Sequence, residues 1–179
     1  MRLFYAITLP EPVKDALAGF SACLRDLSDK GRFTDRDNFH LTLAFLGEVP
    51  PDRLEQAYDA MRSVSCGSFP LSFSDFGRFH RGTREIWWVG VDASDALNHM
   101  QAQLAAAVRL AGFALADQPY RPHLTLGRDI LPKPGADPRP LAGDLPSLSM
   151  RVGTISLMES ARINGRLAYT PIRTHRLNG

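Results

Sequence analysis

A four-residue motif, HLTL, occurs twice in this 179-residue chain, at residues 40–43 and again at residues 123–126. Successive side chains of an extended strand point to opposite faces, so each copy places its His and Thr on one face and its two Leu on the other. This pattern is typical of a strand with one buried apolar face. The repetition constrains the fold more than either copy alone, because two such strands must exist in one molecule.

The segments that flank the two motifs also agree. His123 follows His40 by 83 positions, and at this offset the apolar strand pattern of residues 3–6 coincides with that of residues 86–89. An amphipathic helical pattern follows each strand, so we expect two similar lobes related by a pseudo-twofold axis. The apolar positions of the helices are Val13, Leu17, Phe20, Leu24 and Leu27 in the first, and Leu97, Met100, Leu104, Ala107 and Leu110 in the second.

Helix and strand patterns alternate along the chain, while hairpin signals favour antiparallel pairing. We therefore predict an α+β fold: a single bilobal domain over residues 1–179, in which each lobe is a mostly antiparallel sheet with helices packed outside, around a central cleft. The other expected elements are a helix at 52–64, strands at 69–79 and 85–91, a Pro/Gly-rich loop at 132–147, and strands at 150–158 and 166–177 joined by an Asn164-Gly165 turn.

Composition narrows the class of protein. Hydrophobic residues make up 44% of the chain and charged residues 22%, as in ordinary soluble globular proteins. Prolines at positions 10 and 12 interrupt the apolar N-terminal segment, which we expect to be a buried strand and not a signal peptide. Only two cysteines are present, so we expect reduced thiols in a cytoplasmic protein. No run approaches the roughly 20 apolar residues of a membrane span, so we expect no membrane association. We also expect a monomer with no obligate protein partner.

Charge is unevenly distributed. Residues 1–118 hold 12 Lys/Arg and 15 Asp/Glu, a balance of −3, whereas residues 119–179 hold 9 and 4, a balance of +5. A basic C-terminal third suits an anionic partner, although a solvated surface explains it almost as well.

The paired motifs indicate acid–base chemistry. Hydrolysis of a phosphoester needs one group that takes a proton from the nucleophile and another that protonates the leaving oxygen. His40 and His123 can fill these roles near neutral pH, because an unperturbed imidazole has a pKa of about 6.5. Thr42 and Thr125 lie beside them and can hold phosphate oxygens. One histidine on a strand is more often structural than catalytic. Packing alone, however, does not explain why both motifs place a His and a Thr on the polar face.

Other residues leave two interpretations open. Arg128 follows the second motif and either holds phosphate oxygens bidentately or is a surface arginine at a strand end; Phe45 stands at the equivalent position of the first copy. Several aromatic residues either stack on a base or fill the core, and we expect at least one tryptophan to be buried. These are Tyr5, Trp87, Trp88, Tyr120 and Tyr169.

Several catalytic motifs are missing from the sequence. It contains no HExxH and no Cys/His cluster, and no glycine-rich nucleotide cradle of the GxxxxGK[ST] or GxGxxG type. We therefore expect neither a metal nor a cofactor.

The two motif segments resemble the paired H-x-[ST]-x signature of the 2H phosphoesterase superfamily. Within it, the chain is similar to the bacterial RNA 2′,3′-cyclic phosphodiesterases, also called 2′-5′ RNA ligases. The matching segments are residues 38–47 and 121–128, including Arg128, together with the N-terminal strand at 2–10, residues 157–160 and the hairpin that ends at Tyr169.

The resemblance implies a two-lobed fold with the histidines facing each other across a cleft. It implies metal-free opening of a 2′,3′-cyclic phosphate to a 2′-phosphate, at the end of an RNA (a tRNA fragment or an oligonucleotide) or in a cyclic mononucleotide. By this analogy His123 is the general base and His40 the general acid, although the sequence does not separate the two roles. Thr42, Thr125 and Arg128 would hold the phosphate. Ligation to a 2′-5′ bond would be a minor reverse activity.

Two alternatives remain open at this point. The chain could be a 2H enzyme for another small nucleotide or for 2′-5′ oligoadenylate. It could also be a non-catalytic RNA-binding module that retains the fold.

Overall fold

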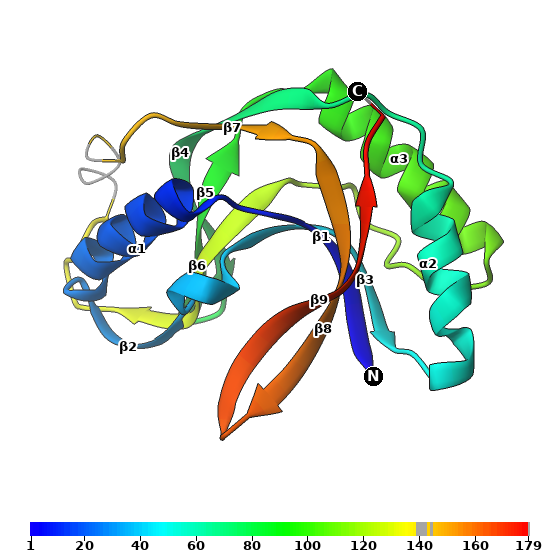
Figure 1. Cartoon of the computed structure of the whole chain (residues 1–179). Coiled ribbons are helices and arrows are strands. Elements are labelled where there is room, and N and C mark those ends of the chain that lie inside the picture. The colour runs from blue at the N-terminus through cyan, green and yellow to red at the C-terminus, as the bar shows by residue number, and fades with distance from the viewer. Residues whose placement is uncertain (139–142, 144, 179) are drawn as a thin grey trace.

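Each HLTL motif begins a strand of its own antiparallel sheet, an edge strand in the first sheet and the strand next to the edge in the second (Figure 1). The computed structural model describes residues 1–138, 143 and 145–178. The first sheet has the strand order β3-β1-β8-β9, and the second has the order β2-β6-β5-β4-β7. The strands are β1 Arg2–Thr8, β2 Ser28–Phe33, β3 His40–Glu48, β4 Phe69–Arg81, β5 Arg84–Val91, β6 His123–Pro132, β7 Leu148–Val152, β8 Thr154–Ile163 and β9 Arg166–Arg176.

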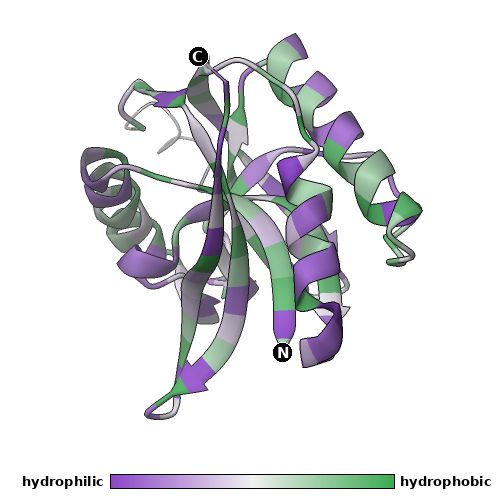
Figure 2. Ribbon diagram, turned by 45° about the vertical axis from the view of Figure 1, so that its right-hand side comes forward, coloured by the Kyte–Doolittle hydropathy of each residue, from purple (hydrophilic) through white to green (hydrophobic). Residues whose placement is uncertain are grey.

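The helices cover the outer face of each sheet. They are α1 Glu11–Arg25, α2 Leu54–Arg62 and α3 Asp95–Leu110, with short 3₁₀ helices η1 at Arg36–Asn38 and η2 at Pro51–Arg53. Pro12 lies in the first turn of α1, and the Ser94 hydroxyl accepts a hydrogen bond from the Leu97 amide at the start of α3, so each helix begins with a favourable residue. Figure 2 shows apolar and polar residues alternating along the helices and strands.

Each lobe's helix packs against the sheet of the other lobe. α1 follows β1 of the first sheet but contacts β2 and β7 of the second, where the rings of Phe20 and Phe76 are 6.1 Å apart. α3 follows β5 of the second sheet and contacts β4 there, but it also contacts β3 of the first sheet, where its Gln101 amide donates a hydrogen bond to the Leu43 carbonyl. α2 contacts β8 and β9 beside it. The two lobes are therefore joined by exchanged helices.

One continuous apolar core runs under both sheets. The four motif leucines are all buried in it, together with Tyr5 and Trp87. Leu41, Leu124 and Leu126 are fully buried, as the alternation in the motif predicts. Burial of these leucines fixes the His and Thr of each motif on the opposite face of the sheet.

The pseudo-twofold relation extends to backbone irregularities. β3 pairs with β1 as β6 pairs with β5, and each motif strand has an extra residue directly after its threonine: Tyr5 and Ala6 pair with Ala44 and Thr42, and Trp87 and Trp88 pair with Gly127 and Thr125. Further along each motif strand the pairing register shifts a second time, before the pair Leu3↔Gly47 in the first sheet and before the pair Glu85↔Ile130 in the second. The α+β fold of two similar antiparallel lobes is confirmed.

Four details differ from the sequence-based expectations. The strand expected at 150–158 is two strands, β7 and β8, which separate at Gly153 and join different sheets. β2 was not predicted, because its sequence SDKGRF is polar and its middle residues are exposed. Leu110 was expected in the core but is 91% exposed, since Val108 takes the buried position in the last turn of α3. The loop at 132–147 is only partly described, because residues 139–142 and 144 lie outside the described residues; within it, β6 extends to Pro132.

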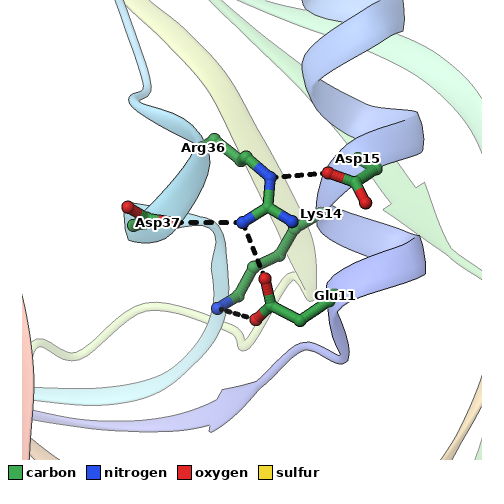
Figure 3. A network of polar contacts seen from close by, with 5 residues as sticks. All are labelled: Glu11, Lys14, Asp15, Arg36 and Asp37. Carbon is green, nitrogen blue, oxygen red and sulfur yellow. Dashed lines mark hydrogen bonds and ion pairs between the residues drawn. The ribbon is translucent and has the colours of Figure 1, made fainter.

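A charged network ties η1 to α1 (Figure 3). Arg36 of η1 contacts Glu11 at 2.7 Å and Asp15 at 2.6 Å on α1, and its neighbour Asp37 at 3.1 Å. Lys14 shares Glu11 at 3.0 Å. Single exposed ion pairs contribute little, but a shared guanidinium with three acceptors fixes the position of a short turn. This turn leads directly into β3.

We expect Leu124→Ala to lower the free energy of unfolding by roughly 2–5 kcal/mol, because it removes a fully buried side chain from the shared core. Leu110→Ala makes the same chemical change at an exposed site and should shift it by less than about 0.5 kcal/mol. Urea unfolding followed by circular dichroism measures both. Equal effects of the two variants would contradict the assignment of the core.

Candidate active site

His40 is the first residue of β3, and two hydrogen bonds fix its ring. Nδ1 lies 2.7 Å from the Asn38 carbonyl oxygen, and Nε2 lies 3.0 Å from the Thr42 hydroxyl. A carbonyl oxygen can only accept, so Nδ1 carries the proton, and the lone pair of Nε2 in the neutral ring accepts a hydrogen bond from the Thr42 hydroxyl. The rings of Phe4 and Tyr169 pack against the imidazole at centroid distances of 4.9 and 5.0 Å.

His123 is the first residue of β6 and has the same local geometry. Its Nδ1 lies 2.7 Å from the Arg121 carbonyl oxygen, again two residues earlier in the chain, which leaves Nε2 as the outward nitrogen. The rings of Phe79 and Trp88 lie 5.3 and 6.2 Å from the imidazole. Both motif histidines therefore have the same tautomer and the same type of aromatic support.

The two motif strands meet where the sheets join. β3 contacts β6, and the Tyr120 hydroxyl, just before β6, donates a hydrogen bond of 3.1 Å to the Thr42 carbonyl. His40 is close enough to Arg128 and His123 for both charges to act on its ionisation. The predicted residues His40, Thr42, His123, Thr125 and Arg128 therefore lie in one region of the molecule.

The strand irregularity in β6 decides where Arg128 points. Because of the extra residue after Thr125, Gly127 pairs with the buried Trp87, and the next residue, Arg128, faces the same side as Thr125. Arg128 is exposed, and its guanidinium lies 3.4 Å from the Thr125 hydroxyl. The equivalent irregularity in β3 turns Phe45, 46% exposed, to the same face of its sheet.

Burial lowers the pKa of both histidines. For His40, loss of hydration is the largest cause; the positive charges of Arg128 and His123 add to it, and the hydrogen bond to Asn38 opposes it. For His123, burial again dominates, Arg128 adds to it, and the hydrogen bond to Arg121 opposes it. Both pKa values lie below the ordinary 6.5, so the surroundings of the two histidines favour the neutral rings.

Sequence reasoning missed Asn38, which holds several of these groups in place. The Asn38 side chain is buried, donates to the Leu167 carbonyl at 2.8 Å and accepts from the Tyr169 amide at 3.0 Å. It pairs with the edge of β9 as another strand would, and so holds Tyr169 beside His40. The sequence signal that could have identified Asn38 is a polar residue two positions before the motif histidine. The residue that it binds, Tyr169, is 131 positions away in the chain.

The other aromatic candidates divide between core and site. Trp87 and Tyr5 are fully buried, so the expectation that at least one tryptophan lies in the core is confirmed. Trp88 and Tyr169 are half-buried and contact the two histidine rings, while Tyr120 uses its hydroxyl for a backbone contact. Phe4 and Phe79 complete the ring clusters and were not singled out from the sequence.

The described residues contain neither a metal cluster nor a membrane-spanning helix. No group of three or more His, Cys, Asp or Glu side chains is arranged to hold a metal ion within the described part of the chain. None of the helices in the same residues has the length and hydropathy needed to cross a membrane.

The sequence of residues 3–164 matches the family model described as the 2′-5′ RNA ligase superfamily. The chain belongs to this superfamily. It is 30% identical over 178 residues to the Escherichia coli K12 protein named RNA 2′,3′-cyclic phosphodiesterase, a match that covers 96% of this chain and 94% of that protein. A Geobacillus stearothermophilus protein of the same name is 33% identical over 128 residues, which cover 70% of this chain and only 41% of that relative.

Solved structures of the superfamily share the whole architecture. E. coli LigT in complex with 3′-AMP superposes with a TM-score of 0.83 at 28% identity, covering 99% of this chain and 98% of that one. A Thermus thermophilus protein superposes with a TM-score of 0.79 at 27% identity, covering 100% and 99%. The expectation of a 2H-type fold in an enzyme of this superfamily is confirmed.

Acidification should destabilise the protein through the two half-buried histidines. Their pKa values are lowered in the folded protein, so the unfolded chain binds more protons than the folded protein does once the pH falls to about 6.5 and below. The stability that comes from keeping both histidines neutral in the folded protein is fully present above pH 6.5. It is lost as the pH falls through the pKa values that the two histidines have in the folded protein. Urea unfolding at about pH 7.5 and about pH 5.5 should show a smaller loss for the His40→Gln/His123→Gln double variant than for the wild type. Parallel losses in the two proteins would contradict this origin.

Proposed function

We propose that the protein hydrolyses the 2′,3′-cyclic phosphate end of RNA to a 2′-phosphate, by metal-free general acid–base catalysis with two histidines. The observation that carries this proposal is the matched pair His40 and His123, each with Nδ1 bonded to a backbone carbonyl, which leaves Nε2 as the nitrogen for proton transfer. The relatives named RNA 2′,3′-cyclic phosphodiesterase and the LigT structure with 3′-AMP support the choice of substrate.

In the proposed step, water attacks phosphorus while the bond from phosphorus to O3′ breaks. Nε2 of His123 takes a proton from the water, and protonated His40 gives its Nε2 proton to O3′. The products are a 2′-phosphate and a free 3′-hydroxyl, and the two histidines exchange protonation states. The bound cyclic phosphate is an anion, so it favours the protonated form of one ring against the effect of burial.

Arg128, Thr125 and Thr42 would hold the phosphate during this step. Arg128 and Thr125 already lie together at 3.4 Å, and a guanidinium stabilises the charge that develops on the non-bridging oxygens. Thr42 contacts the acid, His40, at 3.0 Å and can exchange that contact for a phosphate oxygen.

The proposal also covers the location, oligomeric state and domain organisation of the enzyme. We place the reaction in the cytoplasm, in a monomer whose residues 1–179 form one bilobal catalytic unit that acts on RNA ends. Both cysteines are free thiols, as suits a reducing compartment. Ligation of a cyclic end to a 5′-hydroxyl is the reverse step and would be minor, because it requires two aligned RNA ends in competition with water.

Each of His40→Ala and His123→Ala should lower kcat on an RNA with a 2′,3′-cyclic end by about 10²-fold or more, the usual contribution of a general acid or base. His99→Ala, on the exposed face of α3, is the control and should retain full activity. Phosphate release from the labelled cyclic end, coupled to a phosphatase, measures all three.

The same assay separates the alternatives. A non-catalytic RNA-binding module would show no activity in the wild type and unchanged RNA affinity in both variants. Activity confined to a cyclic mononucleotide or to 2′-5′ linked dinucleotides would assign another substrate to the same site. Loss of activity in EDTA would refute the metal-free mechanism.

The roles of the two histidines can be tested with a modified leaving group. A substrate with sulfur in place of the bridging O3′ releases a thiolate, which needs little protonation. His40→Ala should then recover most of its lost activity relative to wild type, whereas His123→Ala should not. Recovery in His123→Ala alone would exchange the assignments of acid and base.

A further inference from the structure

A carboxylate follows Arg128 directly in the chain. Asp129 lies in the second irregularity of β6, between Arg128 and Ile130, and its backbone is left-handed with a φ of 54°. Asp adopts this conformation more readily than most residues do. In a site proposed to bind an anion, a carboxylate beside the phosphate-binding guanidinium is unfavourable, because it repels the substrate and can itself pair with the guanidinium.

Two arginines from the neighbouring strands hold Asp129. The Asp129 carboxylate is ion-paired with the guanidinium of Arg32 on β2. The Arg84 guanidinium, on β5, donates a hydrogen bond of 3.2 Å to the Asp129 carbonyl oxygen. The strands β2 and β5 flank β6 on its two sides, so the side chain and the backbone of Asp129 are held from opposite directions.

Arg32 lies beside Arg128 in the sheet. The two residues are cross-strand partners in the pairing of β2 with β6, so their side chains emerge from the same face. The Asp129 carboxylate, which Arg32 holds, is therefore on the face that carries Arg128. The Arg128 guanidinium nevertheless contacts the Thr125 hydroxyl at 3.4 Å, while the carboxylate contacts Arg32. Each of the two cross-strand guanidinium groups thus has a different partner.

We propose that Arg32 is a positioning residue, which holds the Asp129 carboxylate away from Arg128 and so keeps the Arg128 guanidinium free for the phosphate of the substrate. This inference rests on the proposed function, in which Arg128 binds the reacting phosphate. Without Arg32, the carboxylate would pair with Arg128. A bidentate pair between these two groups would occupy the guanidinium edge that the phosphate needs.

A double-mutant cycle tests this role. Arg32→Ala should weaken the binding of adenosine 2′-monophosphate, a mononucleotide product, by roughly 10-fold, the scale of one charge-assisted hydrogen bond. In the wild-type background, Asp129→Asn should strengthen binding by only about 2-fold, because it removes one exposed charge near the site. In the Arg32→Ala background, the same change should strengthen binding by roughly 10-fold, because it releases Arg128. Isothermal titration calorimetry measures all four proteins, and kcat/KM for a 2′,3′-cyclic mononucleotide should change by the same factors.

The comparison of the two backgrounds separates this role from a simple effect of charge. If Arg32 acts only through its positive charge, or contacts the phosphate itself, Asp129→Asn will strengthen binding by the same factor with and without Arg32. That result would overturn the proposal. Arg32→Lys keeps a cation for Asp129 and should restore most of the binding. The matched control is the exposed ion pair of Arg62 with Asp59 on α2, where Arg62→Ala should leave binding and activity unchanged.

A crystal structure of the Arg32→Ala variant provides a second test. It should show the Asp129 carboxylate on the Arg128 guanidinium, and a carboxylate that stays away from Arg128 would contradict the proposal. The side chains of Arg32 and Asp129 are 74% and 56% exposed, so we expect the variants to fold, which urea unfolding checks. Asn also tolerates the left-handed backbone at position 129.

Failure of the proposed function has a different signature. A wild type that binds adenosine 2′-monophosphate but hydrolyses no 2′,3′-cyclic phosphate would refute the function, and the binding cycle would still decide the role of Arg32. A wild type that neither binds the mononucleotide nor hydrolyses a cyclic phosphate would refute both. An active wild type whose Arg32→Ala variant binds and hydrolyses equally well would refute only the role of Arg32.

Discussion

Burial of the four motif leucines in one shared core is the constraint on which the rest of the structure depends. Because Leu41 and Leu124 are fully buried, His40 and His123 must lie on the opposite face of their sheets. The exchange of α1 and α3 between the lobes joins the two cores into one. A shift of either strand by one residue would move a histidine into the core, so the packing energy of the leucines also holds the geometry of the site.

The histidines are held by backbone carbonyls, which cannot titrate. Each Nδ1 binds the carbonyl two residues earlier, so the outward nitrogen is Nε2 in both halves of the molecule. The two supports differ, however. Asn38, whose carbonyl binds His40, is itself hydrogen-bonded to β9 and lies in the same short turn as Arg36, which is ion-paired to α1. Arg121, whose carbonyl binds His123, has an exposed side chain. The first motif is therefore tied to β9 and α1 through η1, whereas the second follows a loop.

Much of the fold follows from local patterns, and the exceptions have physical causes. The strands at 69–79 and 85–91, both long helices and the Asn164-Gly165 turn agree closely with the observed elements because each has its own periodic or turn signal. The break at Gly153 was missed because the apolar pattern on its two sides is typical of a single strand. β2 was missed because it forms by pairing with β6 and not by burying a hydrophobic face.

The sequence by itself determined which side chains share a face within each motif, since strand alternation acts over only two residues. It also indicated the two similar lobes through the common offset and the paired chemistry through the residue types. Only the tertiary structure decided that Arg128 and Phe45 turn to that same face, because an extra residue in each strand changes the alternation. It likewise decided the contacts of Asn38 and Tyr169 with His40. These depend on β9 returning beside η1 from more than a hundred residues away, which no local pattern encodes.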